Sequence, residues 1–469
     1  MSHRDSCFQG RRLNAGLLKV ALLWLFRDIR WSSIRWRADC TWPPRLLAAA
    51  AVLWAWSDES NLVTRFLVAR RITSFLFPPQ GKLAASYQAF VKLLVRWTPG
   101  LVALIRAALR ARMQADLAAV WQVGGRLLFG IDGSKIELPR TRSNQTAYAA
   151  AWRVKKKKRP NKLRQRRRRR GAAGIKKADT PLLTVTTVWH VGSGLPWSWR
   201  IGGAYVGERA QVREMLPEVL PGAILAGDAG MVGFDLIRTV QAGGQHMLVR
   251  VGRNVRLLTR LGQVREYDGI VYLWPQKEQA RSVPPLVLRL VVCHNGRHPV
   301  YLVTTLLDAA DCPDDEVVAM YKRRWGIEVY HRGLKQTFQR RKLRSQSAAP
   351  VEVELQWSLV GLWAMSLYAL VQIRRGRPQP GRPSCAKVLE AFRRMLRDYL
   401  HPAERNATLC QRLRRAVIDE YARKAKDSRD YPRKKTTTPP GPPTIVPASA
   451  KQISLAKELR HKTPVGLTA

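Results

Sequence analysis

Two acidic residues stand where a carboxylate could bind a metal ion. Asp132 ends a short apolar run that begins at Arg126, and Asp228 ends a second apolar run, Ala223–Ala226 followed by Gly. Each run has the character of a buried strand, so both carboxylates are expected at a sheet edge that metal and substrate can reach. Either motif alone is weak, because an Asp followed by Gly is also a common turn.

A third acid, Glu328, lies in a segment that predicts one long helix, Asp314–Arg340. At about 100° per residue, the side chain of Glu328 and three others fall within an arc of roughly 60° on one face of this helix. These are the phenol of Tyr321, the guanidinium of Arg324 and the ammonium of Lys335. A carboxylate among cations can be a surface row of salt bridges. It also suits a phosphate held beside a metal ligand.

Three carboxylates are the donor set that two-metal phosphoryl transfer requires. The two ions lie about 3.5–4 Å apart, and Mg²⁺ prefers carboxylate oxygens. One ion would activate the attacking water or 3′-hydroxyl, and the other would stabilise the leaving 3′ oxygen. Asp132, Asp228 and Glu328 are therefore the candidate metal ligands and catalytic residues.

The spacing Y-x2-R-x3-E-x6-K from Tyr321 to Lys335 resembles the signature of the bacterial insertion-sequence DDE transposases of the IS-four family. The order of an Asp after each of two strands, a β-rich insert and then the signature helix is also similar, over about 126–373. The resemblance implies that the three acids bind two Mg²⁺ ions, for which Mn²⁺ can substitute. It implies that Tyr321, Arg324 and Lys335 contact the terminal phosphates of the element.

The same resemblance implies an α/β fold: a ribonuclease H-like mixed sheet of five strands flanked by helices, with a β-rich insertion. It implies cut-and-paste movement, in which the enzyme binds the terminal inverted repeats, water nicks each end, and the freed 3′-hydroxyl joins target DNA. Related enzymes act as dimers on paired ends and often form a hairpin. The sequence departs from the family pattern after Asp228. Ala-Gly-Met follows Asp228 here, whereas the family often has Arg directly after the Asp and an aromatic residue after the Gly.

The elements that must position these residues divide the chain into four regions. Helical periodicity predicts a helical N-terminal region, with Pro99-Gly100 separating two of its helices, Ser86–Trp97 and Leu101–Val120. The resemblance implies that this region binds the DNA ends. The predicted regions are residues 1–125 for DNA-end binding, 126–251 and 301–373 for the catalytic core, 252–300 for the β-rich insertion, and 374–469 for a basic helical C-terminal region whose tail is disordered from 427 to about 448.

Period-two and β-branched segments predict the strands, and period-3.6 segments predict the helices. Leu355–Ile373 is near membrane-spanning length, but Gln356 and Gln372 favour a buried core helix. The expected strands are Leu182–Val191, Leu195–Ile201, Ala223–Ala226, His246–Val251, Val271–Trp274, Leu286–Cys293 and Pro299–Leu306, and two further helices are Glu208–Leu220 and Phe234–Gln241.

The charge of the chain points to nucleic acid as its partner. Lys and Arg number 82 against 33 Asp and Glu, a net charge of +49. Such a field attracts polyanions such as nucleic acid. Binding to a membrane surface usually needs only a local basic patch, so a charge this large favours nucleic acid. We therefore expect double-stranded DNA and no membrane. The densest block is expected to be a loop that clamps DNA phosphates, although a targeting signal or a solvated loop has the same composition; it contains Lys155, Lys156, Lys157, Lys158, Arg166, Arg167, Arg168, Arg169 and Arg170.

Two tryptophans are further candidates. Trp274 is the only Trp of the insertion and could stack on a base flipped out near the cut, as some members of the family do. Trp325 follows Arg324 and could line the site. For both, packing in the core is the ordinary alternative. The six Cys residues show no metal spacing, which favours free thiols in a reducing, cytoplasmic location at the nucleoid.

Four functions fit these features: an active transposase, a decayed transposase that only binds DNA, another nuclease with a ribonuclease H-like core, and a basic membrane-associated protein. Intact Asp132, Asp228 and Glu328 argue against decay, because loss of a ligand is its expected mark. The joint spacing of the signature residues argues against an unrelated nuclease. An active transposase is the function we expect.

Overall fold

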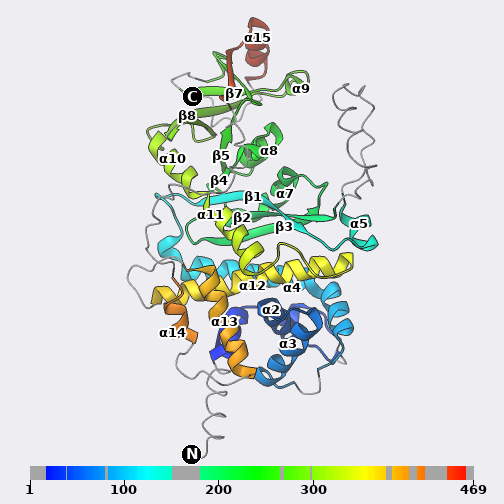
Figure 1. Ribbon diagram of the computed structural model, residues 1–469. Helices are drawn as coiled ribbons and strands as arrows, with labels where there is room; N and C mark the ends of the chain where they lie inside the picture. The colour runs from blue at the N-terminus through cyan, green and yellow to red at the C-terminus, as the bar shows by residue number, and fades with distance from the viewer. Residues whose placement is uncertain are drawn as a thin grey trace, which may run out of the picture.

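The computed structural model describes residues 17–37, 40–79, 83–149, 180–264, 269–295, 298–375, 383–400, 409–417 and 441–460. In Figure 1 the strands lie in the upper half of the molecule and a layer of helices lies below them. The strands form one sheet of ten, in the order β10-β6-β7-β8-β9-β5-β4-β1-β2-β3. The candidate catalytic residues lie in its second half.

Five strands form the catalytic half of the sheet. β1 is antiparallel to β2 and parallel to β4, β2 is antiparallel to β3, and β4 is parallel to β5. This mixed five-stranded arrangement with flanking helices confirms the predicted fold class. The bounds are β1 Leu128–Glu137, β2 Leu182–His190, β3 Leu195–Gly203, β4 Ile224–Gly227 and β5 His246–Val251, with α7 Glu208–Met215 between β3 and β4 and α8 Phe234–Ala242 between β4 and β5.

The remaining strands continue the same sheet. β9 is antiparallel to β5, so the β-rich region extends the core sheet and does not form a second one. The bounds are β6 Arg256–Thr259, β7 Ile270–Leu273, β8 Leu286–Asn295, β9 His298–Thr304 and β10 Thr444–Pro447. The predicted disorder up to about 448 is wrong for β10, which pairs in parallel with β6. Its backbone partners come from a strand almost 190 residues earlier, so no local pattern reveals them.

The helical layer is built around α12, Ala348–Arg375, which is buried along most of its length. This confirms the prediction of a core helix there. Its neighbours are α2 Pro44–Trp56, α4 Tyr87–Asp116, α13 Cys385–Leu400 and α14 Leu409–Arg414, and α3 Leu62–Leu76 packs on α2. Figure 1 shows α12 lying beside α4, directly below β1, β2 and β3.

The predicted break at Pro99 is wrong, because α4 continues through it. Proline lacks the N–H that a helix interior uses, so such a helix needs stabilisation from its neighbours. α12 supplies it: the indole Nε1 of Trp357 donates to the hydroxyl of Thr98 at 2.9 Å. Of the helices described, α4 alone has the length and hydropathy to cross a membrane, although here it packs on α12.

The signature segment is not the single helix that its periodicity predicts. It forms α10, Asp314–Arg323, then α11, Gly326–Arg332, and then a π-helical turn, Gly333–Thr337. At the junction the N–H groups bond to the carbonyl three residues earlier, as when Ile327 donates to Arg324 at 3.0 Å. These tighter bonds separate α10 from α11.

Candidate active site

Asp132 lies in β1, and Asp228 directly follows the neighbouring strand β4. β1 and β4 run parallel, and their last paired positions are Ile131 and Gly227. Each aspartate is the next residue along the chain, and adjacent strands lie about 4.8 Å apart. The prediction that Asp132 ends its strand is wrong, because β1 continues to Glu137 along β2. The pairing between β1 and β4 ends just before Asp132, and both aspartates lie at that point.

Gly326 allows α11 to lie close to the sheet. A Cβ at Gly326 would overlap the ring of Trp189 on β2. A Cβ at Gly130 on β1 would lie 3.7 Å from Cγ of Arg324. Any larger residue at Gly326 would therefore push α11 outward. The close packing of α11 on β1 brings Glu328 to the same sheet as the two aspartates.

Three of the four signature side chains form one group. Arg324 Nη2 donates to Oε1 of Glu328 at 3.1 Å, and its guanidinium lies 5.6 Å from the centre of the Tyr321 ring. The Arg324 side chain is 11% exposed and that of Glu328 is 43% exposed. The buried Nε of Arg324 has no hydrogen-bond partner, and such a donor is costly to leave unpaired. The group is open to solvent on its carboxylate side.

His331 connects α11 to the sheet at Asp132. Its Nδ1 lies 3.5 Å from Oδ2 of Asp132, and its Nε2 lies 3.4 Å from Oγ1 of Thr187 on β2. His331 lies one helical turn after Glu328, so the helix spacing in the sequence could have identified it as a candidate site residue. It had no predicted role.

Lys335 joins the site through Asp132. Burial lowers the pKa of the Lys335 ammonium, and the negative charge of Asp132 opposes that shift. Lys335 lies in the π-helical turn after α11. The charge of the carboxylate on β1 therefore acts on the fourth signature side chain.

Glu208 is a fourth acid at this point and had no predicted role. It is the first residue of α7, directly after the N-cap Gly207. A Cβ at Gly133 would overlap the Glu208 carboxylate, so this side chain lies on β1 next to Asp132. Burial raises the pKa of Glu208, and the negative charges of Asp132 and Asp228 raise it further. An acid at a helix start is ordinary in a sequence, so only the tertiary structure reveals this position.

The donor chemistry of the site fits a hard divalent cation. Its acids are carboxylates, which Mg²⁺ prefers. In the part of the chain that the structure describes, no three His, Cys, Asp or Glu side chains stand close enough together to hold a metal as they are placed. The site therefore has the carboxylate donors that Mg²⁺ prefers, but as placed they do not surround a metal ion.

The other predicted contact residues are placed differently. Lys155 to Lys158 and Arg166 to Arg170 lie outside the described residues. Trp274, just after β7, is 4% exposed, and its Nε1 donates to the Val283 carbonyl at 2.8 Å. Trp325 is 52% exposed, so the expectation that it packs in the core is wrong. It lies at the junction between α10 and α11, directly before α11.

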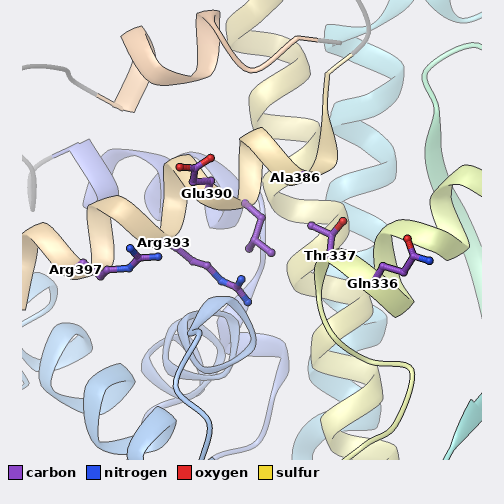
Figure 2. Close-up of a pocket in the computed structure, with 7 residues that line it drawn as sticks. Gln336, Thr337, Ala386, Glu390, Arg393 and Arg397 are labelled. Atoms are coloured by element: carbon purple, nitrogen blue, oxygen red, sulfur yellow. The ribbon is translucent and has the colours of Figure 1, made fainter. Parts of the chain in front are cut away.

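A pocket of about 400 Å³ lies beside the turn that carries Lys335. Figure 2 shows Gln336 and Thr337 of the turn on one side and residues of α13 on the other. Two charged side chains of α13 there already have partners: Arg397 pairs with Asp58 at 2.9 Å and Glu390 pairs with Arg394 at 2.6 Å. The pocket therefore separates the turn from α13 and does not extend the acidic site.

A mixed sheet with Asp132 in one strand, Asp228 directly after the neighbouring strand and Glu328 on a helix packed against the sheet is an arrangement that suits phosphoryl-transfer enzymes as a class. Within that class the chain belongs to the transposase DDE domain family, whose pattern matches residues 124–363. The match takes in Asp132, Asp228 and Glu328.

Two known proteins are similar to this chain. The transposase InsG for insertion sequence element IS4 of Escherichia coli (strain K12) is 26% identical over 155 residues, which is 31% of this chain. The match spans about a third of the length of that protein, 34%. The cryo-EM structure of a piggyBac transposase synaptic complex with hairpin DNA has a TM-score of 0.37 and 11% identity, covering 91% of this chain and 87% of that one.

Proposed function

We propose that this protein binds the terminal inverted repeats of its own mobile element, cleaves the DNA there and joins the 3′-hydroxyl ends to target DNA. The observation that carries the proposal is the register of β1 and β4, which places Asp132 and Asp228 side by side. Glu328 reaches the same sheet because α11 is tied to Asp132 through His331. The family match supports the same chemistry.

In this proposal Asp132, Asp228 and Glu328 hold two Mg²⁺ ions, for which Mn²⁺ can substitute. When bound, the ions activate the attacking oxygen and stabilise the leaving 3′ oxygen. Arg324 must exchange its bond to Glu328 for a phosphate oxygen, since the carboxylate would turn to the metal. Tyr321 and Lys335 complete the contact with the terminal phosphates.

The wider DNA contacts follow from charge. The block from Lys155 to Arg170 supplies phosphate contacts that add affinity without reading sequence. The N-terminal region recognises the element ends, and two copies of the chain hold the paired ends during cleavage. This activity places the protein at the nucleoid.

A cleavage assay tests the proposal. A plasmid that carries the gene's own flanking DNA is incubated with the full chain and Mg²⁺, and a Glu328→Gln protein runs in parallel. We expect cuts at two inverted repeats that require Mg²⁺ and are absent with the variant, while both proteins bind the plasmid. Equal cutting by both proteins would show that the triad is wrongly assigned.

The alternative is a decayed transposase that acts only by binding DNA. The ion pair between Arg324 and Glu328 is the observation in its favour, because it occupies a predicted metal ligand. Tight binding of both proteins to the repeats without cleavage by either would support this alternative and contradict the proposal.

A further inference from the structure

Arg250 lies in one row of the sheet with the two aspartates. β4 and β5 run parallel, and Gly227 of β4 pairs with Val249 of β5. Asp228 and Arg250 are the next residues along the chain. Adjacent strands lie about 4.8 Å apart, so the backbone of Arg250 lies about 10 Å from that of Asp132, with Asp228 between them. Two acids and one cation therefore cross the sheet where the pairing of β1 with β4 ends.

The side chain of Arg250 lies on the sheet face that α10 and α11 cover. Side chains alternate between the two faces of a strand, so Arg250 shares a face with Leu248. Leu248 belongs to a buried cluster that contains Met320 of α10 and Ile327 of α11. α10 packs on β5 and α11 packs on β1. The signature segment therefore runs across the face that carries Arg250.

The two aspartates lie on the same face of the sheet. Leu128 stands four residues before Asp132 in β1. Ala226 stands two residues before Asp228, whose own backbone is extended. Both apolar residues belong to the cluster beneath α10 and α11. The alternation along each strand therefore places the acids and the guanidinium together, in a polar row at the end of that apolar cluster.

Arg250 has no anionic partner within the described residues. Its side chain is half-buried, and in the part of the chain that the structure describes no hydrogen bond or ion pair involves its guanidinium. By contrast, the half-buried Arg200 of β3 pairs with Glu218 at 2.6 Å. A guanidinium has five N–H donors, and partly buried donors without acceptors are costly. An acceptor from outside the described chain would remove that cost.

Tyr321 connects Arg250 to the signature residues. Burial raises the pKa of the Tyr321 phenol, and the positive charges of Arg324 and Arg250 oppose that shift. The guanidinium of Arg324 lies 5.6 Å from the centre of the Tyr321 ring. The charge of Arg250 acts on the same phenol from β5. Two guanidinium groups, one from the sheet and one from the signature segment, thus act on one place beside the aspartates.

We propose that Arg250 binds a backbone phosphate of the DNA strand that is cut, together with Tyr321 and Arg324. The inference rests on the proposed function, because it takes the aspartates to mark the place of cleavage. Guanidinium groups bind phosphate oxygens through paired N–H donors in a fixed plane. Since Asp228 lies between Arg250 and Asp132, Arg250 holds the strand beside the reacting phosphate and does not act on the bond that breaks.

A purely structural role for Arg250 makes a different prediction. In that role the guanidinium offsets the charge of the aspartates in the protein without DNA, so its loss would destabilise the fold. Loss of a phosphate contact changes only the bound state, and it makes DNA binding less dependent on salt. Stability without DNA and the salt dependence of binding therefore separate the two roles.

The experiment measures binding of the full chain to a duplex of the gene's own flanking DNA, at salt concentrations between about 50 and 200 mM. Every protein carries Glu328→Gln, so that the duplex is bound in the presence of Mg²⁺ and is not cut. The variants are Arg250→Gln, Arg250→Lys and the control Arg238→Gln. Arg238 is exposed on α8, which packs on the other face of β5, so the control removes the same charge away from the site.

We expect Arg250→Gln to weaken binding about 10-fold, because a hydrogen-bonded charge contact is lost. The slope of log affinity against log salt should fall by about 1, because one phosphate contact fewer is made. Arg250→Lys should keep the slope, since its ammonium retains the charge. Arg238→Gln should keep both the affinity and the slope, and thermal unfolding without DNA should give all four proteins the same Tm.

Two results would overturn the inference. One is an unchanged salt slope in Arg250→Gln, and a lower Tm alongside it would assign Arg250 the structural role. The other is an equal fall of the slope in Arg238→Gln, which would show a general attraction between charges. Cutting of the duplex by the Glu328→Gln protein would instead contradict the proposed function, and the salt slopes would still decide whether Arg250 binds DNA.

Discussion

Asp132 is held in place by a residue that touches neither substrate nor, in our proposal, metal. His331 reaches it from α11 with Nδ1 at 3.5 Å, while its other nitrogen faces Thr187 at 3.4 Å. His331 is 5% exposed, so its ring has little freedom to turn. Residues that orient a metal-binding carboxylate in this way set how well it binds. We therefore regard His331 as a positioning residue.

Replacement of His331 by Ala should lower Mg²⁺-dependent cleavage about 10–100-fold, because Asp132 would lose its orientation. Titration of cleavage rate against Mg²⁺ concentration checks this, and most of the loss should appear as a higher Mg²⁺ requirement. The matched control is His298→Ala on the exposed end of β9. A His331→Ala protein with the parent's Mg²⁺ dependence would remove the positioning role.

At the scale of elements, Glu218 joins the helical layer to the sheet. Its carboxylate pairs with Arg106 and Arg110 of α4 and with Arg200 of β3. Burial alone would raise the pKa of Glu218, but the hydrogen bonds from Arg110 and Arg200 and the charge of Arg106 lower it to about 2. The single negative charge of Glu218 thus partly offsets the positive charges of three arginines at the junction of α4 and β3.

Glu218→Gln should lower the free energy of unfolding by about 1–3 kcal/mol, because three half-buried cations lose their anion. The folded pKa of about 2 lies below the ordinary 4.5, so the contribution is present above pH 4.5 and is lost as pH falls toward 2. Urea unfolding at pH 7 and pH 3 checks both points. The difference between parent and variant should shrink at pH 3, and a constant difference would refute the charge explanation.

The approach of α11 to the sheet is a second feature at this scale. Gly326→Ala should lower the free energy of unfolding by about 1–3 kcal/mol, because the new methyl group overlaps Trp189. Displacement of Glu328 from β1 should abolish cleavage as well. The control is Gly100→Ala in α4, where a Cβ meets nothing within 4 Å. That change should be neutral or stabilising, and equal losses in both variants would argue against close packing as the cause.

At the scale of the whole molecule, our proposal makes the net charge of +49 the main source of DNA affinity. Neutralisation of the nine block residues Lys155–Lys158 and Arg166–Arg170 to Ser should make duplex binding less dependent on salt. Fewer counterions are released when fewer phosphates are contacted. Binding constants measured at salt concentrations between about 50 and 200 mM test this prediction, because salt changes DNA affinity strongly in that range. Specific and random duplexes should weaken alike, and an unchanged salt slope would show that the block does not contact DNA.

The sequence by itself determined the class of fold and the candidate residues Asp132, Asp228 and Glu328. Short β-branched runs gave the strands, and the spacing from Tyr321 to Lys335 pointed to the family. These signals are local: side-chain periodicity repeats within a few residues and survives in any tertiary context. The buried helix α12 was predictable for the same reason.

Only the tertiary structure decided how distant segments meet. It continued α4 through Pro99, divided the signature segment after Arg323, paired β10 with β6 and left Trp325 exposed. It also brought Glu208 and His331 to Asp132 from segments 76 and 199 residues away along the chain. Such contacts depend on packing between remote elements, and a single sequence holds no local pattern that encodes them.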